Sequence, residues 1–483
     1  MYSTDNELNQ LIKQLGQGKT DSVAYDTAWI ARLHARYPST GSARTIRWLL
    51  DRQHSDGSWG SDVSHYHDHL TCTLAAILGL AENDRASYQQ SIENGLSYLQ
   101  NNAGKLINDR NDTIAFRGVS NLLLEDARTI GLQVPDQIPY KNDSSGKLQF
   151  LKQHPEQWPT HPIVHSLECF RVGLPAVTNC LAKNGLIGAS PAASAAVLLN
   201  SEQSEPAILA ALEKLQQTDG GYPTLSTIDL FEIVWSIDML KNSGQLNHEQ
   251  RQALKIPLDY VWQHWTTTQG LGASSQLACT DLDDTAAAYG VLNWAGYPVN
   301  LDVFEHYEKN DHFETFPNET DPSLSAHLRL LAVLKIQPPS ARRSRWIAKI
   351  LTFLHEYTSE WTDKWHASPL YLWTLAATIL HNLDEPLADR HLQAILNNQN
   401  ADGGWGYYQS SSEETAYALQ ALNQRMNCPT DIREAGYRYL DEHHSDQPPA
   451  LWIGKCLYHP PLVVQAAIWA ARPLALYNEQ KTT

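Results

Sequence analysis

Apolar residues recur along this chain at the three- to four-residue spacing of amphipathic helices. In the segment 204–217, Ile208, Leu212 and Leu215 share one helical face, and Pro206 suits a first turn. The same spacing predicts further helices at 42–53, 71–81, 347–357, 370–380 and 415–422. Because no segment shows the strict alternation of a half-buried strand, the pattern predicts an all-α protein.

A weak internal repeat follows three of these predicted helices. Gln53-His-Ser-Asp-Gly-Ser-Trp-Gly60 is matched by Gln399-Asn-Ala-Asp-Gly-Gly-Trp-Gly406 and, more loosely, by Gln216-Gln-Thr-Asp-Gly-Gly-Tyr222. Each copy reads as a helix end with a Gln, a turn at Asp-Gly and an aromatic ring after the turn. We expect the ring and the Gln side chain to tie one helix end to the next, in two stacked-helix units. The alternative is three unrelated helix-terminating turns.

Composition and charge narrow the class of protein. The chain has 483 residues, 42% hydrophobic and 18% charged, which fits a globular protein of two or three domains. Its 36 Lys and Arg against 53 Asp and Glu give a net charge of −17, which argues against non-specific binding to nucleic acid. An anionic substrate would therefore need a local basic pocket.

The cysteines and the apolar runs predict a cytoplasmic protein. The six cysteines are scattered, with no Cys-x-x-Cys pair and no metal-site spacing, so we interpret them as reduced thiols. The opening MYSTDNELNQ lacks the basic and apolar regions of a signal peptide. No apolar run approaches the roughly 18 residues that span a bilayer.

The densest acidic segment is Asp281-Leu-Asp283-Asp284-Thr285, which precedes an Ala-rich helical run. It can be read as a plain helix start, with Asp281 as N-cap and Asp284 in the first turn. It can also be interpreted as a proton donor, because three close carboxylates cannot all ionise freely and one is expected to keep its proton. The helix dipole would stabilise the carboxylate left after that proton is lost. Such a group could serve as an acid toward an unreactive alkene.

The segment 281–286 (DLDDTA) also resembles the DxDDTA motif of class II terpene cyclases, which protonate an isoprenoid alkene or epoxide to start cyclisation. Other segments resemble the same family in the expected order, at 22–29 (SVAYDTAW), 231–235 (FEIVW), 361–365 (WTDKW), 413–417 (EETAY) and 451–455 (LWIGK). The resemblance covers nearly the whole chain. It is strongest to bacterial diterpenyl diphosphate synthases such as the tuberculosinyl (halimadienyl), kolavenyl and copalyl enzymes.

The resemblance implies an all-α fold of two α-barrel domains, called γ and β, with a deep pocket between them. In this family the γ domain is inserted after the first helix of the β domain. We therefore expect residues 1–20 to form an N-terminal helix of the β domain, residues 21–222 the γ domain, and residues 223–483 the rest of the β domain.

The resemblance also assigns an activity. Asp283 would protonate geranylgeranyl diphosphate, Asp281 and Asp284 would orient Asp283 and tune its acidity, and Thr285 would hydrogen-bond the cluster. Two rings would close and the diphosphate would be retained, because the chain shows no DDxxD/E motif for ionising it. The bicyclic product is expected to pass to a class I terpene synthase, a candidate partner.

The aromatic content fits carbocation chemistry. The chain has 15 Trp and 21 Tyr beside only 8 Phe, and each aromatic face stabilises a cation by about 0.5–2 kcal/mol without acting as a base. Trp265, Trp365, Tyr371 and Trp452 lie in or beside the matching segments and are candidate substrate contacts. Ordinary core packing is the alternative.

The last proton must leave the cation. His165 resembles the His of a His–Asn pair that serves this step in plant enzymes making ent-copalyl diphosphate, but Thr224 stands at the Asn position. Because an incomplete pair prolongs the life of the cation, hydride and methyl shifts are favoured. We expect a halimane or clerodane such as kolavenyl diphosphate, with a labdane (copalyl) product as the alternative.

The retained diphosphate needs cationic partners. Where family members commonly carry Gly-Phe-Glu near a Mg²⁺, this chain has Ala-Phe-Arg117, and Arg117 could bind phosphate oxygens directly. Lys364 and Lys455 are further candidates. Asp68 and Glu168 are the acidic candidates for holding Mg²⁺, the expected cofactor.

Four other functions compete with this assignment. A drimenyl-type sesquiterpene cyclase would use farnesyl diphosphate, and squalene-hopene-type enzymes share the acidic motif but are longer and carry more repeats. A protein prenyltransferase would need an Asp/Cys/His zinc set that the sequence does not show. A non-catalytic α-toroid would use the acidic motif only as a helix cap.

Overall fold

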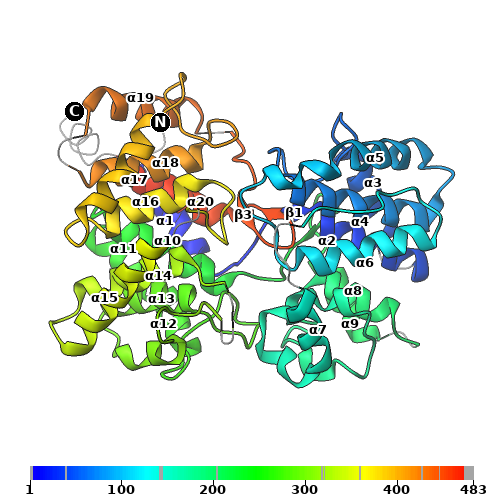
Figure 1. The fold of residues 1–483 in the computed structure, drawn as a ribbon, viewed down its shortest axis with the longest axis horizontal. Helices are drawn as coiled ribbons and strands as arrows, with labels where there is room; N and C mark the ends of the chain where they lie inside the picture. The colour runs from blue at the N-terminus through cyan, green and yellow to red at the C-terminus, as the bar shows by residue number, and fades with distance from the viewer. Residues whose placement is uncertain are drawn as a thin grey trace.

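The computed structural model describes residues 4–38, 41–140, 145–202, 205–316, 319, 321–357, 360–425, 428–444 and 446–472. Within these ranges it contains 20 α-helices, five 3-10 helices and four strands of two residues each, which confirms the all-α prediction. The helices form two lobes that lie side by side (Figure 1).

The elements of the first lobe follow one another closely. They are β1 (Ser22–Val23), α2 (Ala24–Arg36), α3 (Ser42–Asp51), α4 (Tyr66–Asp84), α5 (Gln89–Asn102), η1 (Ala103–Asn108), α6 (Phe116–Thr129), α7 (Ser145–Gln153), η2 (Pro155–Thr160), η3 (Pro162–Phe170), η4 (Thr178–Cys180), α8 (Pro191–Leu199), α9 (Pro206–Leu215) and β2 (Tyr222–Pro223). Strands β1 and β2 pair antiparallel.

The second lobe takes both ends of the described chain. Its elements are α1 (Thr4–Gln14), α10 (Asp229–Asn242), α11 (His248–Ala253), α12 (Lys255–His264), α13 (Leu282–Trp294), η5 (Leu301–Tyr307), α14 (Leu324–Ile336), α15 (Ala341–Glu356), α16 (Pro369–Ile379), α17 (Glu385–Asn397), α18 (Ser412–Asn423), α19 (Thr430–Glu442), β3 (Trp452–Ile453), β4 (Leu457–Tyr458) and α20 (Pro461–Ala471). Strands β3 and β4 form a hairpin.

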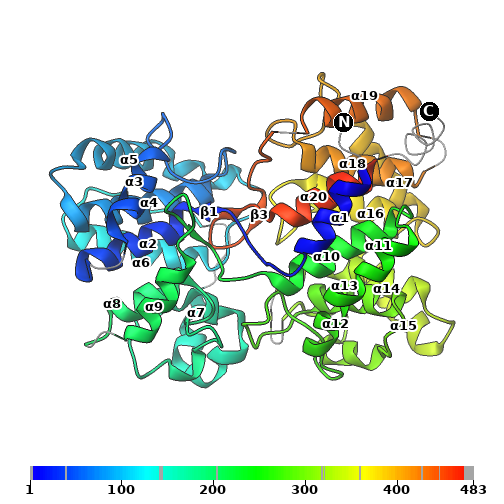
Figure 2. The ribbon, with the colours of Figure 1, turned by 180° about the vertical axis from the view of Figure 1, so that it is seen from behind.

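Each lobe has its own large hydrophobic core. The first core is drawn from residues 23–222 and adds Cys456 from the β3–β4 hairpin. The second is drawn from α1, Ala189 and residues 225–471. Helix α1 packs against α20, so segments from opposite ends of the chain lie together in the second lobe (Figure 2).

The helices found at the six predicted segments are α3, α4, α9, α15, α16 and α18. The main difference lies at their starts. Helix α4 begins at Tyr66 rather than at residue 71, because the His65 side chain caps it by accepting from the Asp68 N–H at 3.2 Å. Among the helices of the described ranges, none is both long enough and apolar enough to pass through a bilayer.

The three copies of the repeat share one local structure, as predicted. The side-chain amide of Gln53 donates to the carbonyl four residues later and to the carbonyl of Ser91 on α5. Gln399 donates to the carbonyl four residues later and to that of Ile432 on α19, and Gln216 also reaches the carbonyl four residues later. The glycines that follow the aspartates have φ values of +94°, +86° and +98°, a region that favours glycine.

The aromatic residue of each copy is bound to a buried helix. The N–H of Trp59 donates to Thr73 Oγ1 on α4 at 3.0 Å, and that of Trp405 donates to Thr415 Oγ1 on α18 at 2.9 Å. The loose copy makes the same contact to Thr27 on α2. Each copy thus joins the end of one helix to a threonine of a buried one.

Candidate active site

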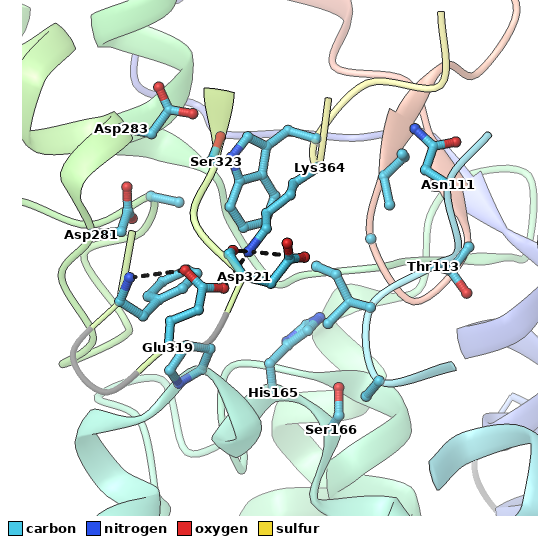
Figure 3. A pocket seen from close by; sticks show the side chains of 18 of the residues that line it. Asn111, Thr113, His165, Ser166, Asp281, Asp283, Glu319, Asp321, Ser323 and Lys364 are labelled. Carbon is cyan, nitrogen blue, oxygen red and sulfur yellow. Dashed lines mark hydrogen bonds and ion pairs between the residues drawn. The ribbon is translucent and has the colours of Figure 1, made fainter. Parts of the chain in front are cut away.

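A cavity of about 760 Å³ opens between the two lobes, a size that suits a small organic ligand. The first lobe contributes residues 110–117, 161–163, 165 and 166 to its wall. The second lobe contributes the start of α13, residues 321–324 and the β3–β4 hairpin. In Figure 3, Asp281 and Asp283 lie on one side of this cavity, and Asn111, Thr113 and His165 lie on the other.

The cavity brings together nine of the residues predicted for the site. They are Asp281, Asp283, Asp284, His165, Thr224, Arg117, Lys364, Trp365 and Trp452. Six other predicted residues are not part of its wall as described: Thr285, Trp265, Tyr371, Lys455, Asp68 and Glu168.

The acidic motif forms the first turn of α13. Asp281 is the N-cap, and its Oδ1 accepts from the Asp284 N–H at 2.7 Å. All three aspartates are buried. The Thr285 hydroxyl bonds to Leu271 and to Tyr307 rather than to the carboxylates, so it secures the helix start instead of joining the cluster.

Asp283 has one cationic neighbour and one hydroxyl neighbour. Its Oδ1 forms an ion pair with Arg329 Nε on α14 at 3.1 Å. Its Oδ2 lies 3.3 Å from Ser325 Oγ, which also lies 2.6 Å from Oδ1 of Asp363. Because one hydroxyl proton cannot serve two carboxylates, both contacts are hydrogen bonds only if one of the carboxyl groups is protonated.

The electrostatics of the cluster favour a retained proton. The pKa of Asp283 is raised to about 7, mainly by burial, which Arg329 opposes and to which the charges of Asp363 and Asp281 add. Burial also raises the pKa of Asp281 to about 6 and, together with Asp281, holds the pKa of Asp284 well above its usual range. The first turn of α13 can therefore hold a proton near neutral pH and release it into the cavity.

Arg329 is a site residue that the sequence analysis missed. It is buried in α14 and lies over the Trp235 ring at 4.1 Å. It also donates to the Tyr371 hydroxyl at 2.6 Å and lies 3.6 Å from Asp238. Tyr371 is thus connected to Asp283 through Arg329 and does not line the cavity.

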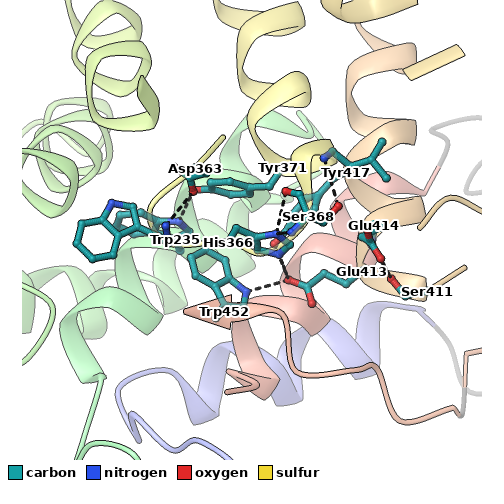
Figure 4. A network of polar contacts seen from close by, with 12 residues as sticks. Trp235, Asp363, His366, Ser368, Tyr371, Ser411, Glu413, Glu414, Tyr417 and Trp452 are labelled. Carbon is teal, nitrogen blue, oxygen red and sulfur yellow. Dashed lines mark hydrogen bonds and ion pairs between the residues drawn. The ribbon is translucent and has the colours of Figure 1, made fainter. Parts of the chain in front are cut away.

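Aromatic rings line much of the cavity. Trp365 and Trp452 are joined there by rings that the sequence analysis did not single out: Phe116, Phe231, Trp235, Phe316, Tyr357 and Tyr458. Trp452 is held from behind, because its indole N–H donates to Glu413 at 2.8 Å in the polar network of Figure 4. Trp265, by contrast, packs against Tyr289 in the second core.

His165 on η3 faces the acid cluster from the first lobe (Figure 3). Its Nδ1 lies 3.3 Å from the carbonyl of Gly188, so Nδ1 carries the proton in this contact and Nε2 keeps a lone pair. Burial and the charge of Lys455 hold the pKa of His165 well below its usual range. The ring is therefore a neutral base, and Thr224 lies on the same cavity wall.

The structure corrects the assignment of Lys455 as a substrate contact. This side chain is fully buried and donates to Glu168 Oε1 at 3.0 Å, to the His165 carbonyl at 3.1 Å and to Ser190 Oγ at 2.7 Å. These contacts use all three N–H groups of the ammonium.

The structure also corrects the prediction that Asp68 and Glu168 hold a metal ion in the cavity. Asp68 accepts from the N–H groups of Ser61 and Leu457, each at 2.8 Å, and Glu168 is bound by Lys455 and Tyr25. Among the described residues, two buried groups have the spacing to hold a metal, His65–His67–Asp109 and Asp68–Cys72–Cys456, and neither lines the cavity.

Charged groups gather at another part of the cavity wall. The cations there are Arg110, Arg117, Lys147 and Lys364, and the acids are Asp112, Glu319 and Asp321. Lys364 forms ion pairs with Glu319 and with Asp321. Burial raises the pKa of Asp112, and the nearby charge of Asp321 raises it further.

Comparison with known proteins gives concordant matches, although no family model matches the chain. It is 31% identical over 493 residues to a type B diterpene cyclase of Mycobacterium tuberculosis, covering 96% of this chain and 98% of the relative. It is 30% identical over 492 residues to an ent-copalyl diphosphate synthase of a Streptomyces species, covering 93% and 91%. The solved ent-copalyl diphosphate synthase of Streptomyces platensis superposes with a TM-score of 0.82 at 28% identity, covering 97% and 98%.

Proposed function

The chain belongs to the class II diterpene cyclase family, and on that premise we propose that it converts geranylgeranyl diphosphate to a bicyclic diterpenyl diphosphate. As a family member it is an enzyme of the intramolecular lyase or isomerase type. The observation that carries the proposal is Asp283, a buried carboxyl with a pKa of about 7 on the wall of a cavity lined with aromatic rings.

The proposed reaction begins at Asp283. Its carboxyl gives a proton to the terminal alkene of the substrate, and the carboxylate left behind is paired with Arg329. Two ring closures then move the positive charge along the chain. The rings of Trp235, Trp365 and Trp452 line this path and stabilise the cation without taking its proton.

The final step is the loss of a proton. His165 is the proposed base, because it lines the cavity as a neutral imidazole with Nε2 unprotonated. Thr224 stands where the resemblance places an Asn, which supports a longer-lived cation and a halimane or clerodane product such as kolavenyl diphosphate. A labdane of the copalyl type is the second candidate, favoured by the ent-copalyl diphosphate synthases among the similar proteins.

The diphosphate is proposed to lie among Arg110, Arg117, Lys147 and Lys364. The donors present also fit Mg²⁺, because Asp112 and Asp321 offer hard oxygen ligands whose mutual repulsion a divalent cation would relieve. When bound, Mg²⁺ would neutralise diphosphate charge. If the metal contributes, a chelator lowers turnover and added Mg²⁺ restores it; unchanged turnover would show that the basic residues suffice.

The test is to incubate the purified protein with geranylgeranyl diphosphate and, separately, with farnesyl diphosphate. Products are dephosphorylated and identified by mass spectrometry and NMR. A bicyclic C20 alcohol from the first substrate supports the proposal, and a drimenyl-type alcohol from the second would make the enzyme a sesquiterpene cyclase. Recovery of only linear alcohols from both would contradict it and leave a binding protein as the interpretation.

Three accompanying proposals complete this assignment. The first lobe corresponds to the γ domain and the second to the β domain, as their separate cores support. The enzyme works in the cytoplasm, as its six free cysteines support. Because the diphosphate is retained, the product is a substrate for a class I terpene synthase.

A further inference from the structure

The β3–β4 hairpin, residues 452–458, belongs to both lobes. Trp452 at its first strand lines the cavity and is bound to Glu413 of the second lobe. Cys456 lies in the hydrophobic core of the first lobe. The Gly454 carbonyl accepts from the N–H of Ile114, another wall residue of the first lobe.

Lys455 extends from this hairpin to the two segments that hold the His165 ring. It donates to the main-chain carbonyl of His165 at 3.1 Å and to Ser190 Oγ at 2.7 Å. Ser190 follows Gly188 by two residues, and the Gly188 carbonyl is the partner of His165 Nδ1. The ammonium therefore fixes both the backbone that carries the ring and the turn that binds it.

Gly188 and Ser190 both leave the turn little freedom to move. Gly188 has a φ of +53°, and a Cβ there would come within 2.0 Å of the Val164 carbonyl, so the backbone of the turn lies directly against the segment bearing His165. Ser190 also caps α8, because its Oγ accepts from the Ala193 N–H at 3.1 Å.

The charge of Lys455 is balanced within the first lobe. Glu168 Oε1 accepts from Lys455 at 3.0 Å and from the Tyr25 hydroxyl at 2.9 Å, and Asp26 Oδ1 lies 3.7 Å from the ammonium. None of these groups lines the cavity. Lys455 thus influences His165 without a contact to the substrate.

We propose that Lys455 is a positioning residue that fixes the imidazole of His165 from behind the cavity wall and thereby selects which proton the last cation loses. The inference rests on the proposed function, since it takes His165 as the final base. The hairpin sets both the Trp452 face of the cavity and the position of the base, so regiochemistry is controlled from outside the cavity.

The test variant is the double substitution Lys455→Met with Glu168→Gln. Removing both charges leaves Asp26 as the buried carboxyl that loses its cation, and burial already raises the pKa of Asp26 to about 7, so it can take up a proton instead. With geranylgeranyl diphosphate we expect the ratio of product isomers to change at least threefold, in the direction produced by H165A, with most turnover retained. The control is D21A, which removes the contact of Asp21 with His459 just after the hairpin. D21A loosens the same junction away from His165 and is expected to keep the parental ratio.

A second variant, S190A, removes the link between Lys455 and the turn together with the side-chain cap of α8. It is expected to shift the ratio in the same direction by a smaller factor, and it carries the test should the double variant fail to fold. The proposal would be overturned if a folded double variant kept the parental ratio of products. The same holds if the double variant does not fold and S190A keeps the parental ratio, or if D21A shifts the ratio equally.

The imidazole ¹⁵N signals of His165, assigned by comparison with H165A, give a readout that needs no turnover. The parent should show the Nδ1–H tautomer, and the double variant a mixture of tautomers. If the parent makes only linear products, the proposed function fails while these signals still decide whether Lys455 positions the ring. Identical signals in parent and double variant would count against the positioning role.

Discussion

Helices α13 and α18 begin with the same arrangement of residues but give their acids opposite properties. Asp283 lies two residues after the N-cap Asp281, and Glu413 lies two residues after the N-cap Ser411. Each acid is followed by a second acid and a threonine, and each is buried in the second lobe. Yet burial leaves the pKa of Asp283 raised to about 7, whereas the pKa of Glu413 is lowered.

The difference comes from the neighbours. Glu413 Oε1 accepts from the indole N–H of Trp452 at 2.8 Å and from the Tyr417 hydroxyl at 3.0 Å, and it pairs with His366 at 3.3 Å (Figure 4). These donors offset the cost of burial, which alone would raise the pKa. Asp283 has Arg329, but Asp363 and Asp281 oppose that cation. At Asp283 the effect of burial therefore prevails, because the neighbouring acids add to it and a single cation opposes it.

The largest effect is expected from Asp283→Asn. The amide keeps the size of the side chain but has no acidic proton, so turnover should fall by about 10³-fold or more. The equivalent change in the other helix, E413Q, should cost about tenfold or less. Rates of cyclic product formation from geranylgeranyl diphosphate measure both. Comparable losses in the two variants would mean that the two helix starts do not differ in function.

The next effect concerns Arg329 and the pH dependence of the rate. Since the proposed reaction needs protonated Asp283, kcat/KM of the parent should decline as the pH rises through about 7. Arg329 lowers the pKa of Asp283, so Arg329→Gln should move this decline to higher pH while lowering the maximum rate about tenfold. R329K, which keeps the charge, is the control and should stay closer to the parent. A decline that moves to lower pH would contradict the role given to Arg329.

Stability should respond to pH in opposite directions at the two helix starts. The folded protein holds the Asp283 proton more tightly than the unfolded chain, whose pKa is near 3.8, so the parent should lose stability relative to D283N as the pH rises from about 4 to 7. Glu413 has a lowered pKa, so its contribution is present at neutral pH and is lost on acidification below about 4.5.

The limiting slope for each group is about 1.4 kcal/mol per pH unit. Denaturant unfolding of the parent, D283N and E413Q at several pH values measures the two differences. The difference in unfolding free energy between E413Q and the parent should vanish toward low pH. The difference between D283N and the parent should increase toward neutral pH. If the two differences in unfolding free energy changed with pH in the same way, Asp283 and Glu413 would bind their protons alike.

The smallest effect is expected from Tyr417→Phe. This change removes one of the hydrogen bonds to Glu413 and should cost about 1 kcal/mol of unfolding free energy, with turnover within about threefold of the parent. Y437F is the matched control, because the Tyr437 hydroxyl bonds to Asn423 at an exposed position. A similar loss of stability in both variants would mean that the bond to Glu413 has no special weight.

The local features of the site could be read from the sequence because they are set by neighbours along the chain. Asp281 as a helix cap, Asp284 in the first turn and the glycine turns of the repeat all follow from short-range rules. The all-α fold followed from helical spacing in the same way. Phe231 and Trp235 of the segment 231–235, noted only as a matching segment, also proved to line the cavity.

The long-range partners could not be read in this way. Arg329 lies in a helix whose polar residues match no motif, and its role depends on an aspartate 46 residues earlier. Lys455 looked like a substrate contact because it lies in a segment resembling the family, but its partners come from the other lobe. Sequence spacing does not reveal which buried charges pair across a fold.

The packing of α1 against α20 has a consequence for synthesis on the ribosome. The first lobe has its own core and can begin to fold while later residues are still being added, whereas the second lobe must wait for its last helix. Until the hairpin that bears Lys455 has been synthesised, Glu168 lacks its cationic partner. The proposed base His165 then lacks the contact that positions it. We therefore expect catalytic competence to be acquired only after the hairpin and α20 have been synthesised.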